Sequence, residues 1–320
     1  MNFKYYNEII DKIVALKQQG VGSRQIANQL NIGKSTVNQY YKYYLEQNNI
    51  INDDVKDGPK VLVLDIETAP ILGYVWRLWK QNVGLNQINT DWYLMSFAAK
   101  WLGSSEDDII YMDSRNNKNP EDDSEMLKKL WELLDQADWV VHQNGRKFDI
   151  PKIRARMVLN KMKPFSPVRH IDTLEIAKRC FGFTSNKLEY MTDKLCTKYK
   201  KQKHSKFAGF ELWSECMKGN VEAWEEMETY NKFDILSLEE LYFVLVPWYD
   251  KLPNPNLYSD SLKVKCICGS INLKQSGFAT TDVSKFQQYV CEDCGKHYRG
   301  RKNLLTKEKR DSILTNVREN

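Results

Sequence analysis

The chain has 320 residues, of which 42% are hydrophobic and 12% aromatic, and its formal net charge is +5. These values predict a folded protein with one sizeable core and small appendages, and they exclude a disordered chain. The sequence begins without the apolar segment of a signal peptide, and no apolar run is long enough to cross a bilayer, so we expect a cytoplasmic protein. Residues 261–320 contain 12 Lys or Arg and 6 Asp or Glu, which predicts a basic end suited to a polyanion.

Residues 1–50 are predicted to form a small all-α domain. Apolar residues recur at helical spacing over 6–20, and two further helices are expected over 23–30 and 35–47, capped by Ser23 and Ser35. A short helix, a glycine-containing turn and a longer helix resemble the helix-turn-helix units of resolvase-type recombinases and many bacterial regulators. That resemblance implies a set of DNA-binding residues: Lys34, Ser35, Thr36, Asn38, Gln39 and Lys42. The alternative is a helical bundle used for protein contacts.

Residues 51–59 read as a polar linker, and the main domain is predicted over 60–255. Its expected elements, in order, are strands at 60–67, 92–102 and 108–113, a helix at 124–137, a strand at 139–142, a helix at 150–161, a strand at 168–172 and a helical C-terminal half. This order predicts an α/β domain whose central mixed sheet is flanked by helices.

Four of the seven cysteines are clustered in a predicted domain over 262–305. They form two pairs that are each followed by glycine: Cys266 with Cys268, and Cys291 with Cys294. Four thiolates at such spacing suit one tetrahedral Zn²⁺, and the pattern resembles a zinc ribbon with a structural zinc. Because only one residue separates Cys266 from Cys268, His297 is an alternative ligand. Residues 306–320 are predicted to form a basic tail.

Acidic residues stand at the ends of several predicted core elements. Asp65 and Glu67 lie two apart on a strand and therefore share a face, and Asp149 follows another strand. Tyr230 and Asp234 lie four apart on a helix and share a face as well. Gathered carboxylates repel one another unless cations neutralise them, and hard oxygen ligands select Mg²⁺ or Mn²⁺. The pattern predicts two divalent ions and phosphoryl chemistry.

These residues carry a resemblance to a known family. Asp-x-Glu, Asn-Gly-x-x-Phe-Asp and Tyr-x-x-x-Asp resemble the three motifs of the DEDD 3′–5′ exonucleases, which have the ribonuclease-H-like fold. The resemblance covers about 60% of the chain, from Lys60 to Trp248. Thr229 stands where the histidine branch has its His, so Tyr230 indicates the tyrosine branch, DEDDy.

The resemblance implies a role for each matching residue. Asp65 would bridge both metals, while Glu67 and Asp234 would hold the metal that activates water. Asp149 would support the second metal, and Tyr230 would orient the attacking water. The expected substrate-binding residues are Thr68, Asn144 and Phe148. Asp172, which also ends a strand, is expected to be structural or to support the site.

Three functional hypotheses follow. The first is a two-metal 3′–5′ exonuclease that releases nucleoside 5′-monophosphates from single-stranded or frayed DNA ends in a bacterial cell or phage-infected host. DNA is favoured over RNA because a helix-turn-helix fits the major groove of B-form DNA. The second is an exoribonuclease with the same site. The third is a DNA-binding adaptor or regulator whose nuclease fold has little or no activity.

Overall fold

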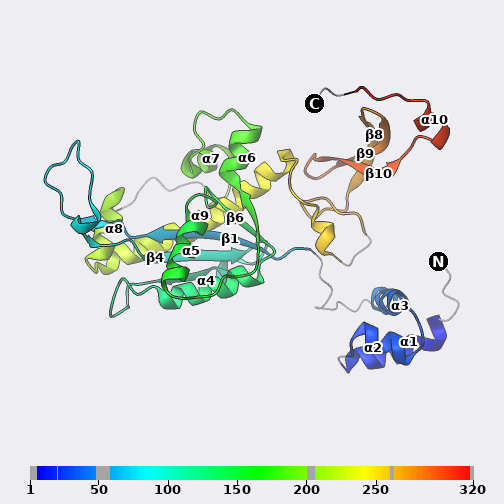
Figure 1. Cartoon of the computed structure of the whole chain (residues 1–320), viewed down its shortest axis with the longest axis horizontal. Coiled ribbons are helices and arrows are strands. Elements are labelled where there is room, and N and C mark those ends of the chain that lie inside the picture. The colour runs from blue at the N-terminus through cyan, green and yellow to red at the C-terminus, as the bar shows by residue number, and fades with distance from the viewer. Residues whose placement is uncertain (1–5, 20, 48–57, 200–205, 260–262, 318–320) are drawn as a thin grey trace. The chain divides into compact units, whose positions relative to one another are not determined.

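The computed structural model of the chain describes residues 6–19, 21–47, 58–199, 206–259 and 263–317 (Figure 1). Contacts divide the chain into two units. One comprises Met1–Asp57 and Ser259–Ser261, and the other comprises Gly58–Tyr258 and Leu262–Asn320. Most of the predicted linker lies outside the described residues. Among the helices that are described, none has both the length and the apolar character needed to cross a bilayer.

The first unit contains three helices, α1 (Tyr6–Gln18), α2 (Ser23–Gln29) and α3 (Lys34–Gln47). Its core consists of buried apolar side chains from all three helices: Ile10, Ile13, Val14, Ile26, Ala27, Val37 and Tyr40. The predicted serine caps are wrong. Gly22 is the N-cap residue of α2 with extended backbone and no side-chain cap, and Ser23 Oγ accepts a hydrogen bond from Lys17 Nζ at 2.7 Å. α3 begins at Lys34, which places Ser35 inside the helix.

The second unit is built around a five-stranded mixed sheet in the order β5-β4-β1-β6-β7. Its strands are β1 (Val61–Thr68), β4 (Leu94–Trp101), β5 (Ile110–Asp113), β6 (Trp139–His142) and β7 (Arg169–Asp172). β1 pairs antiparallel with β4 and parallel with β6, while β5 is antiparallel to β4 and β7 is parallel to β6. The predicted α/β class with a mixed sheet is confirmed. The short hairpin of β2 (Leu72–Gly73) and β3 (Ile88–Thr90) was not predicted.

Helices cover both faces of this sheet (Figure 1). They are α4 (Ser124–Gln136), α5 (Asp149–Leu159), α6 (Thr173–Cys180), α7 (Leu188–Leu195), α8 (Phe210–Met217) and α9 (Val221–Leu245). Leu62 and Leu64 pack in a buried cluster with α4 and α5. Val61 and Val63 pack in a second cluster with α6, α7 and α9. Because side chains alternate along β1, Asp65 falls on the face that α9 covers.

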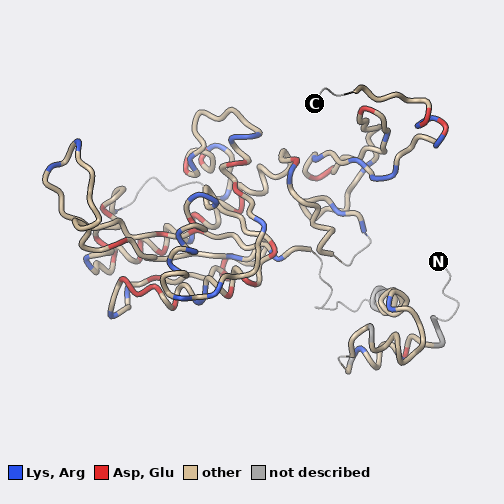
Figure 2. The backbone as a smooth tube through the Cα atoms, in the orientation of Figure 1, with Lys and Arg blue, Asp and Glu red and all other residues tan. Residues whose placement is uncertain are grey.

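A second, three-stranded antiparallel sheet follows in the order β10-β9-β8. Its strands are β8 (Leu273–Thr281), β9 (Ser284–Cys291) and β10 (His297–Asn303), and the helix α10 (Lys307–Asp311) comes after them. Lys and Arg recur on β10, where they occupy three of seven positions (Figure 2). Lys296 Nζ donates hydrogen bonds to the carbonyl oxygens of Val246, Pro247 and Tyr249 at 3.4, 3.2 and 2.6 Å, which joins this module to the segment after α9.

Candidate active site

Three of the candidate carboxylates meet between β1 and α9. One oxygen each from Asp65, Glu67 and Asp234 lies within 4.8 Å of the other two. The strand supplies the first two residues and the helix supplies the third, so the cluster depends on α9 packing across β1. Asp149 is not part of this trio.

The trio is electrostatically unfavourable when no cation balances it. Burial, and then the neighbouring carboxylates, raise the pKa of Asp65 well above its usual value. Burial and the charges of Asp234 and Asp149 raise the pKa of Glu67 from 4.5 to about 8. Carboxyl groups with such raised pKa values bind protons or cations readily at neutral pH. The arrangement is therefore suited to hard divalent cations.

Asn231 holds one of these carboxylates in place. It is fully buried on α9, and its Nδ2 donates a hydrogen bond to Asp65 Oδ2 at 2.7 Å. Its Oδ1 accepts a hydrogen bond from Ser96 Oγ on β4 at 3.2 Å, which fixes the orientation of the amide. Sequence reasoning missed this residue, although a polar side chain three positions before Asp234 on an apolar helix was a signal.

Tyr230 and Trp213 interact with carboxylates of the trio, Tyr230 with Asp234 and Trp213 with Glu67. Burial and the negative charge of Asp234 raise the pKa of Tyr230 above its ordinary value, so the phenol keeps its proton at neutral pH. The Trp213 ring lies edge-on to the Tyr230 ring, with centroids 6.2 Å apart. A hydrogen bond from the Trp213 side chain to Glu67 opposes the rise in the pKa of that carboxyl. Trp213 comes from α8, a helix whose contribution the sequence did not reveal.

Asp149 is the first residue of α5 and is buried beside β1. Its Oδ1 accepts the backbone N–H of Ile66 at 3.3 Å. Burial raises the pKa of Asp149 to about 6, although His142 and two backbone N–H groups oppose the rise. Asp149 therefore lies near the trio. Its charge contributes to the raised pKa values of Asp65 and Glu67, and it hydrogen-bonds to the backbone of the strand that carries them.

Asp172 organises the turn that leads to Asp149. It accepts the backbone N–H of Asn144 at 2.9 Å, and it caps α6 by accepting the N–H of Leu174 at 3.0 Å. Its carboxylate also lies 3.4 Å from His142 Nδ1. Asn144 adopts a left-handed backbone with φ of 62°, which short polar side chains tolerate. These contacts give Asp172 a structural function in this turn.

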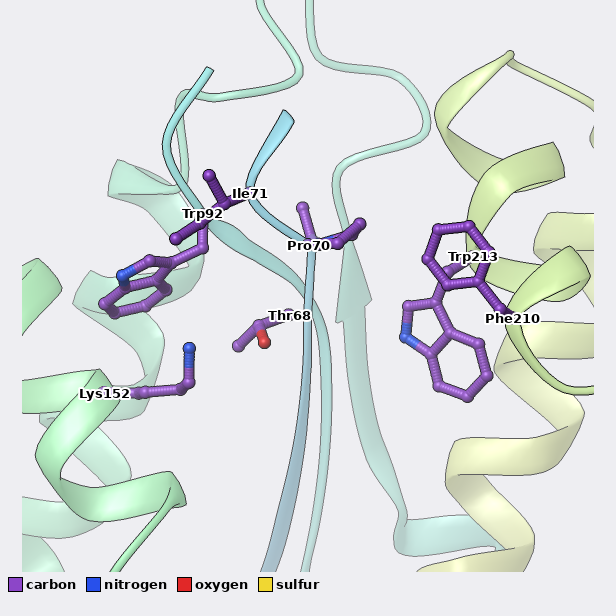
Figure 3. Close-up of a pocket in the computed structure, with 8 residues that line it drawn as sticks. Thr68, Pro70, Ile71, Trp92, Lys152, Phe210 and Trp213 are labelled. Atoms are coloured by element: carbon purple, nitrogen blue, oxygen red, sulfur yellow. The ribbon is translucent and has the colours of Figure 1, made fainter. Parts of the chain in front are cut away.

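A cleft of about 310 Å³ is linked to the trio by Trp213, because the Trp213 side chain both lines the cleft and hydrogen-bonds to Glu67 (Figure 3). Eight residues line it: Thr68, Ala69, Pro70, Ile71, Trp92, Lys152, Phe210 and Trp213. Thr68 is the last residue of β1, the strand that carries Asp65 and Glu67, while Trp92 and Trp213 stand on opposite sides of the cleft (Figure 3). Lys152 Nζ lies 3.7 Å from the centroid of the Trp92 ring and 5.2 Å from that of Phe148. Of the three predicted substrate-binding residues, only Thr68 lines the cleft.

A second cluster of side chains that could hold a metal ion lies in the C-terminal module. The sulfur atoms of Cys266, Cys268, Cys291 and Cys294 lie within 4.8 Å of one another. The Cys266–Cys294 and Cys268–Cys291 sulfur distances are 3.4 and 3.7 Å. Tetrahedral zinc with Zn–S bonds of about 2.3 Å separates its sulfurs by roughly 3.8 Å. The alternative ligand, His297, has its Nδ1 3.0 Å from Gln288 Nε2.

The two cysteine turns aim backbone N–H groups at sulfur. Although burial acts in the opposite direction, N–H groups of Cys294 and Asp293 lower the pKa of Cys291 to about 7. Gly269 and Gly295, which follow the second cysteine of each pair, have φ of 88° and 74°, a left-handed conformation that glycine adopts without strain. Tyr298 Oη lies 3.1 Å from Cys266 Sγ. Burial raises the pKa of Cys268 to about 11 and raises that of Cys294 as well, although the N–H groups of Ser270 and Lys296 oppose both rises. Of these three thiols, only Cys291 is therefore stabilised as a thiolate by the turns themselves.

The predicted DNA-binding residues lie on the first turns of α3. Lys34, Ser35, Asn38 and Gln39 are exposed and Thr36 is half-buried, while Val37 and Tyr40 face the core of this unit. The side chain of Lys42 lies outside the described part of the chain. Lys34, Ser35, Asn38 and Gln39 are thus accessible on the outside of α3.

Comparisons with known proteins extend this picture. A family model described as the RNase_H superfamily matches residues 83–246, a range that contains Asp149, Tyr230 and Asp234 and begins after Glu67. A similar solved structure is that of the family B DNA polymerase from the hyperthermophilic archaeon Pyrobaculum calidifontis. The identity is 12%, the TM-score is 0.41, and the match covers 59% of this chain and 25% of that chain. No curated protein matches the chain.

Proposed function

Because the chain belongs to the RNase_H superfamily, we propose that it is a metal-dependent 3′–5′ exonuclease of the DEDDy branch. Its substrate would be DNA, cut at single-stranded or frayed 3′ ends. The observation that carries this proposal is the meeting of Asp65, Glu67 and Asp234 within 4.8 Å, beside an aromatic-lined cleft. A cluster of this kind between a central strand and a helix is suited to phosphoryl transfer.

The residues present fit two Mg²⁺ or Mn²⁺ ions. The donors are carboxylate oxygens, which these hard cations prefer. The raised pKa values of Asp65 and Glu67 mean that cations relieve an existing repulsion. Asp65, Glu67 and Asp234 would hold the ions, and Asp149 would support the second from beside β1. When bound, the ions supply an acidified water and stabilise charge on the phosphate.

The protein's own groups would position the reactants. Tyr230 retains its phenolic proton, so it can donate a hydrogen bond that orients the attacking water. Asn231 holds Asp65 in one orientation through its 2.7 Å hydrogen bond. The cleft between Trp92 and Trp213 would accept the 3′-terminal nucleotide, with Thr68 at its edge. Asn144 and Phe148 would act from the turn before α5.

The flanking modules would bind metal and nucleic acid. Cys266, Cys268, Cys291 and Cys294 would hold one structural Zn²⁺, as their sulfur spacing allows. The exposed start of α3 would contact DNA through the residues at 34–42, which favours DNA over RNA as the polymer.

Digestion of 5′-labelled single- and double-stranded DNA and RNA with Mg²⁺ or Mn²⁺ tests the proposal. We expect a ladder of 5′-labelled products that shorten from the 3′ end of DNA, together with nucleoside 5′-monophosphates. Degradation of RNA alone would indicate an exoribonuclease. Intact substrates with retained DNA binding would indicate an adaptor and refute the enzyme.

A further inference from the structure

A hairpin with exposed aromatic side chains continues directly from the candidate active site. We call residues 71–90, which include β2 and β3, the aromatic hairpin. Trp76 is 93% exposed, Leu78 85%, Trp79 80% and Leu85 88%. Soluble proteins rarely expose large apolar side chains in one contiguous segment unless that segment binds something. Such exposure makes the aromatic hairpin a candidate binding surface.

The exposed rings stand on an ordered scaffold. Gln81 Oε1 accepts the backbone N–H groups of Trp76 and Arg77 at 3.1 and 3.3 Å. Gln87 Nε2 donates to the carbonyl oxygen of Tyr74 at 2.9 Å, and the backbone N–H of Tyr74 donates to Gln87 O at 2.8 Å. Arg77 Nη2 donates to Lys80 O at 3.1 Å. Because this backbone is already ordered, binding there costs less conformational entropy.

Position and charge indicate what the aromatic hairpin binds. Its base begins at Ile71, which lines the cleft together with Ala69 and Pro70 (Figure 3). Between residues 68 and 90 the only charged residues are Arg77 and Lys80, and both are positive (Figure 2). Tryptophan rings with neighbouring cations and no carboxylate fit a polyanion whose bases offer flat faces. Single-stranded nucleic acid has this chemistry.

We propose that the aromatic hairpin stacks on unpaired bases of the nucleic-acid strand just outside the cleft, a role that rests on the proposed nuclease function. Trp76 and Trp79 stack on bases, and Arg77 and Lys80 contact the adjoining phosphates. Stacking tolerates any base, so the surface adds affinity without sequence preference. A dinucleotide occupies only the cleft, whereas a longer strand reaches the aromatic hairpin and binds more tightly.

The test compares long and short substrates in matched variants. Trp76 and Trp79 are replaced together by alanine, and Trp248→Ala is the control, because Trp248 is another tryptophan with high exposure, at 70%. Binding of a labelled oligothymidylate of about 15 nucleotides is measured by fluorescence anisotropy, with Asp65→Ala added to prevent cleavage. Turnover of a dinucleotide is measured with Asp65 intact.

We expect the double variant to bind the long strand at least tenfold more weakly, which corresponds to about 1.4 kcal/mol. Dinucleotide turnover should stay within about twofold, because stacking outside the cleft adds nothing for so short a substrate. Trp248→Ala should match the unsubstituted protein in both assays. Arg77→Gln with Lys80→Gln should weaken long-strand binding mainly at low salt, and this second variant keeps the rings in place.

If the variant with alanine at Trp76 and Trp79 bound the long strand as tightly as the unsubstituted protein, the proposal would be overturned. A change of oligomeric state in sedimentation with unchanged affinity would overturn it as well, because the aromatic hairpin would then contact protein. Failure of the proposed function is distinguishable, since the unsubstituted protein would then cleave neither substrate. The binding comparison decides on the aromatic hairpin in that case as well.

Discussion

The carboxylate cluster and the thiol cluster are built by the chain in different ways. Asp65 and Glu67 come from a central strand and Asp234 from a helix far along the sequence, so their meeting requires the folded core. The four thiols come from two short turns beside a small sheet. The first site therefore depends on the packing of a large core, whereas the second lies in a small sheet with few buried side chains.

Burial shows what this difference implies. The sheet that carries the carboxylates lies between two large apolar clusters. Among the described residues 263–303, only Cys266 and Cys291 are buried. A module whose only fully buried side chains are two of these cysteines has little apolar core, so the proposed zinc would supply much of its stability. Losing cations should therefore impair chemistry at the first site and structure at the second.

The largest effect is expected from breaking the thiol cluster. Cys294→Ser should lose the bound zinc and unfold the module, because structural zinc contributes about 10–16 kcal/mol in zinc-finger peptides. Metal analysis and limited proteolysis within residues 263–303 measure both losses. Turnover of a dinucleotide should persist, and Cys180→Ser, outside the cluster, should keep its zinc. Loss of dinucleotide turnover would show that the two regions are not independent.

Breaking the carboxylate cluster should sharply reduce cleavage and leave the structure and the zinc content unchanged, the opposite of the result expected for Cys294→Ser. Asp65→Ala should reduce cleavage at least about a thousandfold, because the remaining ligands no longer hold the metals in place. Its melting temperature should change little, because removal of an unfavourable buried charge offsets the loss of the hydrogen bond from Asn231. Its zinc content should be unchanged. Asp193→Ala, on the surface of α7, is the control and should cleave normally; a residual rate near normal in Asp65→Ala would contradict the assignment.

A smaller effect is expected at the tyrosine. Tyr230→Phe keeps the ring against Trp213 and removes only the hydroxyl group. Turnover should fall about 10- to 100-fold, because the attacking water loses an orienting hydrogen bond while the metal ligands remain. Steady-state kinetics at saturating Mg²⁺ measures this loss. Tyr242→Phe, on the same helix but in the core, should turn over normally, and a loss as large as that of Asp65→Ala would argue against a positioning role.

Much of the core fold could be predicted because its signals are local. The apolar runs and the order of strands and helices indicated the mixed α/β sheet, and that prediction is confirmed. Residues two apart on β1 and four apart on α9 had to share a face, whatever the tertiary structure. Which strand face met which helix was not local information, and only the resemblance suggested it.

The supporting residues of the site could not be predicted for the same reason. Trp213 reaches Glu67 because α8 packs beside α9, and nothing in its own segment indicates this. Asn231 matters because Ser96 and Asp65 approach it from two different strands. The aromatic hairpin has an apolar sequence that periodicity alone cannot tell from a core segment. Its exposure is a property of the folded chain.

The smallest expected effect is a pH dependence of the melting temperature. It arises from the carboxylate cluster and leaves both clusters intact. The pKa of Glu67 rises from 4.5 to about 8 on folding, so the folded protein holds a proton that the unfolded chain releases. The protonation of Glu67 stabilises the folded protein fully below pH 4.5, the pKa of the unfolded chain, and this stabilisation is lost as the pH rises to about 8. In Mg²⁺-free buffer with zinc retained, the melting temperature should therefore fall by roughly 2–6 °C as the pH rises from 4.5 to about 8.

Added Mg²⁺ should stabilise the protein more at the upper end of this range, because metal and proton compete for the same carboxylates. Glu67→Gln should reduce both dependences, since the amide neither titrates nor carries charge, and the part that remains comes from Asp65 and Asp149, whose pKa values are raised as well. Glu132→Gln, on the exposed face of α4, should retain them. Differential scanning calorimetry at several pH values measures the slopes. A melting temperature that rises with pH in the absence of Mg²⁺ would mean that Glu67 gains no proton on folding, and the carboxylate cluster would then lack the repulsion that favours cations.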